Sequence, residues 1–553
     1  MNTGSALGRG ALAATGASVA LTLAVAAAGP SVMEPPLPGA PGQPPWSFAA
    51  HLPAHLAVAL SAAALITGTA GVGLSLLAAA RGWLPRPSML LLAGIGVAVL
   101  LVFLPPFGSA DHLSYAAYGR MAVTGHDPYT TGPDALARLG DPVARAVQRY
   151  GDWQTTPSVY GPLATAGQAL ASLIGGVSAR LTVFVLSLLN VASFAGAGLL
   201  LHRLARRDRA RQLRAALLWT LNPLLLYELV AGAHVDTQLA FFAVAAVAAF
   251  GMRERNGSRW APFTRPVPRC VIAGALAGLA FSVKLTGVLV IGGLAWAVVA
   301  GGAPGAPGAP GGPEDGGYRR GERVRQLVAL AAGFAVVSGT ALALAGRHAL
   351  AQVLRGSSYV SISSPWRAVR TVARLAIGHA AAGTLVSVGS AALALLLLVL
   401  LLRGLPGPTV TRAADSRRPA SLVIPAPGAR AVFAFVVAWL FAWPYVLPWY
   451  DALAWVLLPL VAFSWADWLL LARTAALAVG YLPARASVRL SADLGWLQSV
   501  VRTGVTPVVL TAALVALVLA SRHPPATGTA APAGDGTGAK EGTMSRWLTS
   551  RQP

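Results

Sequence analysis

Long apolar runs alternate with short polar stretches along most of the chain. A helix that crosses a bilayer needs about 20 apolar residues, because about 30 Å of hydrocarbon is crossed at about 1.5 Å per residue. The candidate spans are 11–29, 56–80, 88–105, 180–202, 212–230, 236–252, 270–283, 286–301, 325–346, 380–402, 430–448, 451–472 and 502–521. The pattern predicts an all-α integral membrane protein, a polytopic bundle of about 13 transmembrane helices.

Two apolar segments need a separate decision. Segment 161–176 would reach only about 24 Å as a helix, so we expect it to lie on or dip into the outer leaflet. Segment 11–29 resembles a signal peptide, but no convincing small-residue cleavage site follows it before Pro30. We therefore expect this segment to remain as a helix.

Composition narrows the class of protein further. Of the 553 residues, 55% are hydrophobic and only 11% are charged, and mean hydropathy is +0.63. These values exclude a soluble globular protein, a disordered chain and a coiled coil. The single cysteine, Cys270, excludes a disulfide framework and a cysteine-based zinc site.

The net charge of +23 follows membrane topology rather than nucleic-acid binding. With the N-terminus in the cytoplasm, 27 of the 42 Lys and Arg residues fall in cytoplasmic stretches, including 473–502, and 15 fall outside, including those of the C-terminal tail. This topology places the loops 106–179 and 347–379 on the outer face.

The same pattern divides the chain into five parts. They are N-terminal helices with a Pro-rich outside linker (1–87), a central transmembrane module that includes loop 106–179 (88–302), a Gly/Pro/Ala-rich linker (303–324), C-terminal helices (325–521) and a flexible tail (522–553).

The first outside loop carries the densest polar and aromatic patch. Asp111 follows the exit of a span, and His112, Tyr115 and Tyr118 recur at helical spacings of three and four residues. The sequence GHDPY (125–129) then predicts a turn. This arrangement suits a juxtamembrane helix with one carboxylate and a sugar-stacking aromatic face. Alternatively, Asp111 caps a short helix and the tyrosines are interfacial anchors.

Two further places combine charge with a helix end. The turn GAHVD brings His234 and Asp236 between two spans, either facing the first loop or as a capping turn. Lys284 interrupts a long apolar stretch. We expect this lysine at the outer interface, where a cation suits a lipid phosphate or simply snorkels to water.

Two later segments complete the outer face. Loop 347–379 carries five arginines and the sequence SSPWRAVR, which suits an anionic partner such as a phosphate or an amphipathic helix on anionic lipid. The run FAWPYVLPWYD (441–451) suits either carbohydrate stacking or an aromatic belt. No nucleotide-binding or zinc-protease motif occurs. A lipid-linked glycan transporter or flippase is disfavoured, because the polar residues gather at one face rather than at the midplane.

Seven segments together resemble a known family. They are D-x-x-x-Y-A-A-Y-G (111–119), G-H-D-P-Y-x-x-G-P (125–133), W-Q-T-T-P-S-V-Y-G-P-L (153–163), N-P-L-L-L (222–226), the GAHVD turn, the V-K pair at Lys284 and W-P-Y-x-x-P-W-Y (443–450). Over roughly residues 85–460 the chain resembles the actinobacterial polyprenol-phosphomannose-dependent α-1,6-mannosyltransferases of the GT-C glycosyltransferase superfamily.

The resemblance implies a function and a mechanism. It implies that a sugar, most often mannose, moves from a polyprenyl-phosphate donor to a glycan or lipoglycan acceptor of the cell envelope at the outer face of the plasma membrane. It implies an inverting transfer in which a carboxylate of the first loop is the general base, and Asp111 matches that place. The leaving phosphate would be stabilised by cations, for which Lys284 and the arginines of 347–379 are candidates. Donors carrying arabinose or glucose remain the alternative.

Besides Asp111, we expect a set of side chains to bind substrate. They are His112, Tyr115, Tyr118, Arg120, Asp127, Tyr129, Trp153, Tyr160, His234, Asp236, Lys284, Arg367, Arg370, Trp449 and Tyr450. Relatives often have Asn where Val235 stands, and Asp111 is followed by His112 rather than by a second acid. Without a paired carboxylate, we expect no metal, and we expect no other cofactor. Because the basic residues follow membrane topology, we also expect no nucleic-acid partner.

Overall fold

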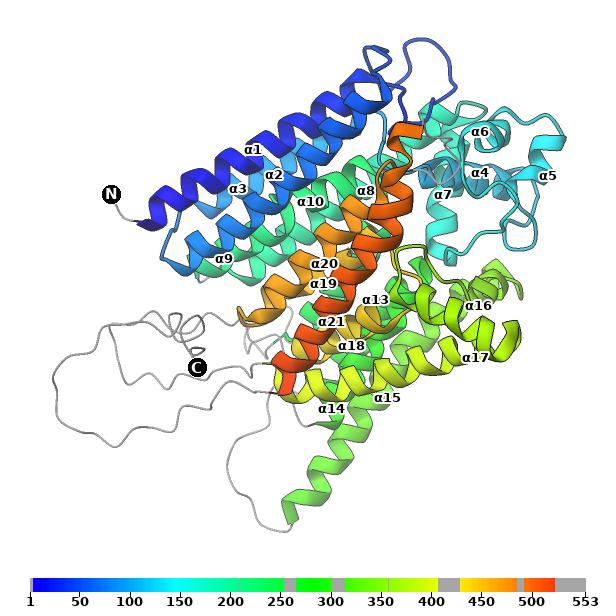
Figure 1. The fold of residues 1–553 in the computed structure, drawn as a ribbon. Helices are drawn as coiled ribbons and strands as arrows, with labels where there is room; N and C mark the ends of the chain where they lie inside the picture. The colour runs from blue at the N-terminus through cyan, green and yellow to red at the C-terminus, as the bar shows by residue number, and fades with distance from the viewer. Residues whose placement is uncertain are drawn as a thin grey trace.

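The structure is a computed structural model, and it confirms the all-α class. It describes residues 3–206, 208–252, 265–300, 314–356, 358–405, 428–484 and 492–522, with side chains only from residue 320 in the fourth range. Within these ranges the regular elements are all helices (Figure 1). The predicted tail from 523 on, and the linker up to 313, lie outside the described residues.

The helices follow the predicted apolar runs closely. The first half holds α1 Thr3–Ala28, α2 Ala54–Ala80, α3 Pro87–Val102, α4 Asp111–Val123, α5 Pro133–Arg138, α6 Pro142–Tyr150, α7 Pro162–Gly175, α8 Ala179–Leu204, α9 Arg209–Ala215, α10 Pro223–Leu225 and α11 Asp236–Phe250. The second half holds α13 Pro266–Val283, α14 Val288–Val299, α15 Glu314–Ala345, α16 Ala351–Gly356, α17 Pro365–Gly404, α18 Ala429–Ala442, α19 Ala452–Leu457, α20 Trp465–Tyr481 and α21 Thr506–Arg522.

Membrane crossing is supported by helix length and composition. Among the described residues, eight helices are long and apolar enough to span a bilayer, and four apolar helices are shorter. The chain is therefore a multi-pass membrane protein, and the total of 13 spans stays a prediction. Segment 161–176 forms α7, which has 14 residues and is not among the candidate spans.

The predicted span 451–472 is wrong, because the chain turns back inside it. α19 ends at Leu457, and Ser464 and Asp467 form a capping box that starts α20. The Tyr481 ring lies 5.1 Å from that of Trp449, so α20 ends beside the start of α19. Hydropathy alone joined two helices that the capping signal separates.

This reversal also corrects the predicted topology of the C-terminal part. Arg502 Nε donates to Gly480 O at 2.8 Å, so it lies beside the end of α20. The other end of α21 packs against Gly404, where an added Cβ would overlap Ser521. Residues 502 and 521 therefore lie at the opposite ends of the bundle from those predicted.

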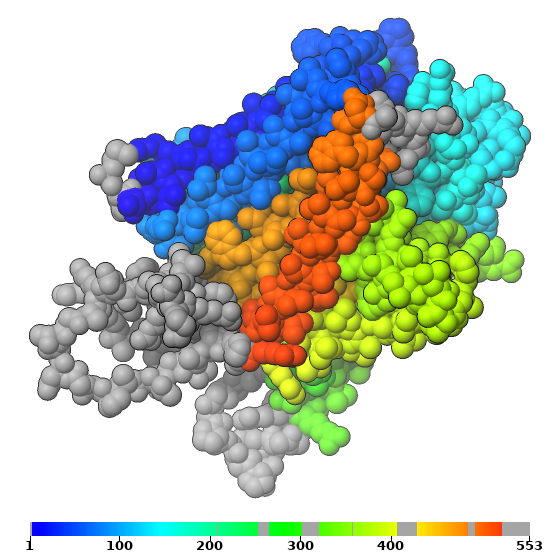
Figure 2. All heavy atoms as spheres, viewed as in Figure 1, coloured from blue at the N-terminus to red at the C-terminus, as the bar shows by residue number. Residues whose placement is uncertain are grey.

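The polar loop segments gather at one end of the bundle. Helices α4, α5, α6 and α7, drawn in cyan, form a lobe there that we call the α4–α7 lobe (Figure 1). In the space-filling view the lobe lies next to the yellow-green residues of α16 and α17 (Figure 2). Segment 347–379 is mostly helical, as one of its two interpretations expected, because α16 and the first part of α17 fall within it.

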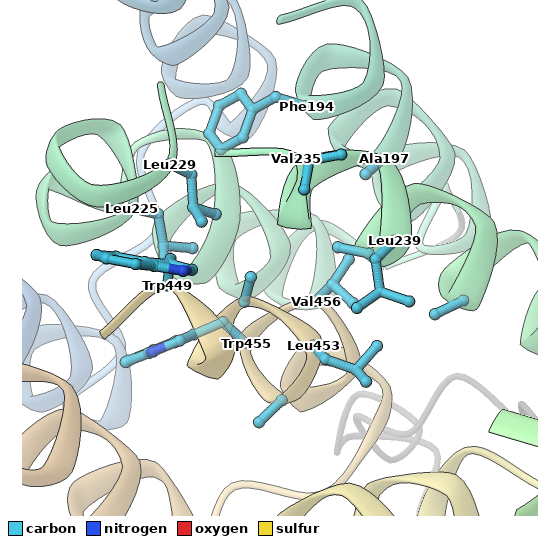
Figure 3. Packing of buried hydrophobic residues seen from close by; sticks show 14 of the residues in the cluster. Phe194, Ala197, Leu225, Leu229, Val235, Leu239, Trp449, Leu453, Trp455 and Val456 are labelled. Atoms are coloured by element: carbon cyan, nitrogen blue, oxygen red, sulfur yellow. The ribbon is translucent and has the colours of Figure 1, made fainter. Parts of the chain in front are cut away.

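The buried hydrophobic core of the bundle continues up to this end. Trp449 lies beside Leu225 and Leu229, which come from a distant segment of the sequence (Figure 3). Trp455 is fully buried and donates its indole N–H to Thr474 Oγ1 at 2.9 Å. The short helix α19 is thus enclosed by protein, which explains how it is accommodated at less than the length of a span.

A buried ion pair joins the residue before α19 to α20. Loss of this pair should make the protein easier to unfold. Asp451 pairs with Arg473 and accepts from Thr474 Oγ1 at 2.7 Å. Removing one partner of a buried pair costs about 3 to 5 kcal/mol. We expect Arg473→Met to lower the melting temperature in detergent strongly. Asp451→Leu with Arg473→Met should recover most of the loss, and a double variant no better than the single one would contradict this assignment.

Candidate functional site

A cavity of about 470 Å³ opens between the α4–α7 lobe and the C-terminal helices. Its polar lining is Asp111, Ser114, Thr156, Lys284 and Thr286, and its aromatic lining is Tyr118, Trp153, Tyr160, Tyr359, Trp439, Trp443, Tyr445, Trp449 and Tyr450. Among the described residues that line it, Asp111 is the one carboxylate and Lys284 the one cation. An aromatic chamber with a few polar groups is typical of a site that binds a small amphipathic ligand.

Asp111 starts α4 but does not cap it. Ala110 is the N-cap residue, and its side chain makes no capping hydrogen bond. The Asp111 Oδ1 atom instead accepts from the indole Nε1 of Trp153 at 3.2 Å, and its backbone N–H donates to Ser109 Oγ at 3.0 Å. The carboxylate is therefore turned away from the helix backbone and held against the cavity wall.

The environment of Asp111 favours the protonated acid. Burial, with a smaller contribution from the nearby charge of Asp152, raises the pKa of Asp111 to about 7. The indole hydrogen bond and the charge of Lys284 oppose this rise. A carboxyl group with a pKa near neutrality can accept and release a proton within the physiological range.

The turn after residue 231 brings His234 to Asp111, as the sequence suggested. His234 Nδ1 lies 3.7 Å from Asp111 Oδ2 and 3.5 Å from the hydroxyl of Tyr115. Its ring stacks on Trp449 at 3.7 Å between centroids. Burial, and then the charge of Lys284, lower the pKa of His234 well below its usual value. The imidazole is thus neutral and held in place.

Lys284 lies at a break between two helices. α13 ends at Val283, and the backbone of Lys284 is extended before the chain resumes towards α14. Its Nζ atom lies 2.9 Å from Asp236 Oδ1 and 3.8 Å from the ring centroid of Tyr450. The cation is thus partly neutralised by Asp236 and also faces the cavity.

The aromatic wall comes mainly from the segment after α18. Trp439 stacks on Tyr450 at 5.8 Å and lies 6.4 Å from Trp443. Tyr160, which also lines the cavity, meets the buried Tyr115 ring edge to face at 4.9 Å. These faces are suited to pack a sugar ring or an apolar chain.

Several predicted site residues lie away from the cavity. Arg120 Nε donates to Asp141 at 2.7 Å, and Tyr129 donates to Thr165 Oγ1 at 2.8 Å, so both hold the α4–α7 lobe together. Asp127 accepts from the backbone of Tyr129 within the predicted turn.

Six more of the predicted residues are outside the lining, namely His112, Tyr115, His234, Asp236, Arg367 and Arg370. His112 and Tyr115 are buried behind it. Arg367 and Arg370 lie on α17 and are not among the lining residues either.

Some lining residues were not singled out from the sequence. Trp439 lies four residues before Trp443, so its helical spacing was a usable signal. Leu354 reaches the cavity from α16, and Tyr359 reaches it from just beyond this helix. No local sequence pattern marks either residue. In the part of the chain that the structure describes, no three His, Cys, Asp or Glu side chains are grouped to hold a metal ion.

A glycine sets the approach of the first loop to Lys284. Gly161 N donates to Val283 O at 2.9 Å, and a Cβ at this position would overlap the Ser282 carbonyl. This contact fixes Tyr160 beside the helix break. The close approach therefore requires a residue without a side chain.

We expect Gly161→Ala to loosen the lobe. The added methyl group must push the loop away from the end of α13, so the protein should melt at lower temperature and trypsin should cut faster after Arg145 and Arg149. Gly167→Ala is the matched control, because its Cβ would meet Leu189 at an ordinary 3.6 Å. Equal melting and cleavage of the two variants would contradict this role.

Comparisons with known proteins identify related sequences. Residues 13–300 match the family model described as "Alpha-(1->6)-mannopyranosyltransferase, N-terminal domain". Alpha-(1->6)-mannopyranosyltransferase B of Corynebacterium glutamicum is 32% identical over 208 residues, which is 36% of this chain and 32% of that protein. A Mycolicibacterium smegmatis protein named "Probable alpha-(1->6)-mannopyranosyltransferase" is 30% identical over 227 residues, covering 36% of this chain and 38% of its own.

The alignments thus span about a third of the length of these relatives. Among solved structures, the archaeal oligosaccharyltransferase AglB from Archaeoglobus fulgidus, in complex with an inhibitory peptide and a dolichol-phosphate, is 15% identical. The TM-score of this match is 0.37, and the alignment covers 78% of this chain and 56% of that one. At that TM-score the likeness carries no structural conclusion.

Proposed function

Because the chain belongs to the alpha-(1->6)-mannopyranosyltransferase family, whose N-terminal-domain model it matches over residues 13–300, we propose that it is a membrane mannosyltransferase. It moves mannose from a polyprenyl-phosphate donor to a hydroxyl group of an α-1,6-mannan acceptor. The reaction takes place on the extracytoplasmic face of the cell membrane. The observation that carries the proposal is Asp111, the one carboxylate on the described lining of an aromatic cavity.

Asp111 acts as the general base in this proposal. Its carboxylate takes the proton from the acceptor hydroxyl as the oxygen attacks the anomeric carbon. The bond from that carbon to the phosphate oxygen breaks, and the bonding electrons leave with the polyprenyl phosphate. Attack from the face opposite the phosphate inverts the configuration, so an α-linked product requires a β-linked donor. The leaving phosphate is already ionised and needs no general acid.

Lys284 is the cation available for the leaving phosphate. Its Nζ atom faces the cavity beside Tyr450 while its other contacts go to Asp236. Developing charge on the phosphate oxygen would draw on this preorganised ammonium. The aromatic wall would pack the sugar ring and the first part of the lipid chain.

The first experiment compares variants of two carboxylates, one inside the cavity and one outside it. Membranes with wild type, Asp111→Asn or Asp134→Asn receive radiolabelled polyprenyl-phosphate mannose and a short α-mannan acceptor. Loss of a general base lowers the rate by about 10²–10⁴-fold, so we expect Asp111→Asn to be nearly inactive. Asp134, which pairs with Arg138 and does not line the cavity, should be dispensable.

Two outcomes would overturn parts of the proposal. Equal transfer by wild type and Asp111→Asn would remove Asp111 as the base. Transfer from polyprenyl-phosphate arabinose or glucose, but not mannose, would change the sugar while keeping the reaction class.

The pH dependence should follow Asp111. Because the base must be ionised and its pKa is about 7, kcat/KM should fall about tenfold per pH unit below that value and level off above it. Asp152→Asn removes a charge that raises this pKa, so its acid limb should move to lower pH. An acid limb that stays in place in Asp152→Asn would contradict this origin of the shift.

His234 should orient the carboxylate through its Nδ1 atom. An Nδ1–H group beside Asp111 Oδ2 favours the ionised base, so its removal should lower kcat, leave KM little changed and move the acid limb upward. The amide nitrogen of Asn occupies nearly the position of Nδ1, whereas that of Gln reaches the position of Nε2. His234→Asn should therefore be more active than His234→Gln, and the reverse order would exclude this role.

A further inference from the structure

We propose that residues 365–377, which we call the arginine arm, lie on the anionic phospholipid surface of the bilayer. The arm is the first part of α17, and the interaction joins its arginine stripe to lipid headgroups and its apolar side to the acyl boundary. It does not use the cavity or the transfer reaction.

The length of α17 requires such an arm. The helix has 40 residues, or about 60 Å at about 1.5 Å per residue, which is twice the thickness of the hydrocarbon layer. Gly378 breaks the helix with φ 79° and ψ 173°, a conformation that residues with a side chain rarely adopt. The 26 residues after this break are enough to span the bilayer, so the arm before it has to take another direction.

The arm is amphipathic and is hardly covered by protein. Arg367, Arg370 and Arg374 recur at spacings of three and four, so they form one stripe. Val372 and Leu375 are 67% and 87% exposed. Within the arm, Ala373 is the one residue that the structure buries. A helix with a basic stripe and an uncovered apolar side is typical of helices in the membrane interface.

The arginine stripe needs an anion that the described protein does not supply. The charges that act on Arg370 are those of Arg367 and Arg374, which repel it. Among the described residues, the ion pairs of the structure include none of these three arginines. Like charges held on one stripe are stabilised by the negative surface of a membrane.

The phospholipid surface fits the stripe better than the donor phosphate. None of the three arginines lines the cavity that holds Asp111 and Lys284. The donor phosphate has to reach those two side chains for the proposed transfer. The arm also has many exposed residues over its whole length, which suits an extended surface rather than a single phosphate group.

The base of the arm is bonded to the aromatic wall. Trp366 Nε1 donates to Ala442 O at 2.8 Å, and Val446 N donates to Ser361 Oγ at 3.2 Å. Tyr359, which lies two residues before Ser361, lines the cavity. Holding the arm at the bilayer surface therefore also holds one wall of the cavity at that level.

The test places a polarity-sensitive fluorophore on two neighbouring residues of the full chain. Val372→Cys and Thr371→Cys differ by about 100° around the helix, and Thr371 lies towards the arginine stripe. Cys270 is fully buried and should stay unlabelled. The proteins are reconstituted in phosphatidylcholine vesicles with or without phosphatidylglycerol. We expect a blue-shifted emission at 372 but not at 371, and a larger shift with the anionic lipid.

A matched pair of variants tests the arginines. Arg367→Gln with Arg370→Gln is compared with Arg347→Gln with Arg355→Gln, two exposed arginines outside the arm. Each arginine near an anionic surface contributes about 1 kcal/mol, or about fivefold in affinity. The first pair should therefore lose most of the response to phosphatidylglycerol, and the second should keep it.

Three results would overturn the proposal. They are equal emission at 371 and 372, an equal response of the two double variants, and a response to added polyprenyl phosphate in place of phosphatidylglycerol. The last result would assign the stripe to the lipid donor. The fluorescence needs no transfer activity, so failure of the arm and failure of the proposed function are distinguishable.

Discussion

A buried ion pair between Lys284 and Asp236 joins the segments on which the cavity depends. Asp236 starts α11, and Lys284 occupies the break between α13 and α14. Inside a bilayer an unpaired charge at a helix break is expensive, so the two breaks stabilise each other. The same pair brings the turn with His234 to Asp111 and turns the ammonium towards Tyr450. The polar site therefore lies where helices end. There, the polar groups of the backbone and side chains find partners on other segments.

The charges of Asp111, Asp236 and Lys284 together determine how easily Asp111 is ionised. Asp236 neutralises much of Lys284, and burial keeps Asp111 close to half protonated near neutrality. An ionised Asp111 would leave the group with an excess negative charge and oppose an anionic donor. In the proposed transfer, binding of the donor phosphate and protonation of Asp111 would be favourably coupled, whereas base catalysis would require the proton to leave. The Trp153 indole donates to the carboxylate, and as an uncharged group it would stabilise the ionised form in the proposed transfer without adding a charge beside the phosphate.

The family match covers only part of the chain that lines the cavity. The match covers residues 13–300, which include Asp111, His234 and Lys284. The lining from 353 to 450, with most of the aromatic wall, lies beyond it. The polar centre therefore belongs to the part shared with the family, while the surfaces that would contact the sugar and the lipid come largely from outside the match.

Local sequence determined the helices, most of their ends and the residues placed at them. Apolar runs defined the spans, Lys284 marked a helix break, and Ser464 with Asp467 carried a readable start signal that hydropathy alone overlooked. The pairing of these ends was decided by the tertiary structure. Spacing fixes where a side chain lies along a helix, but contacts between segments over a hundred residues apart decide its partner. Asp111 with His234, Tyr359 in the cavity and the reversal at residue 461 depend on such contacts, because packing and the pairing of buried charge are properties of the whole bundle.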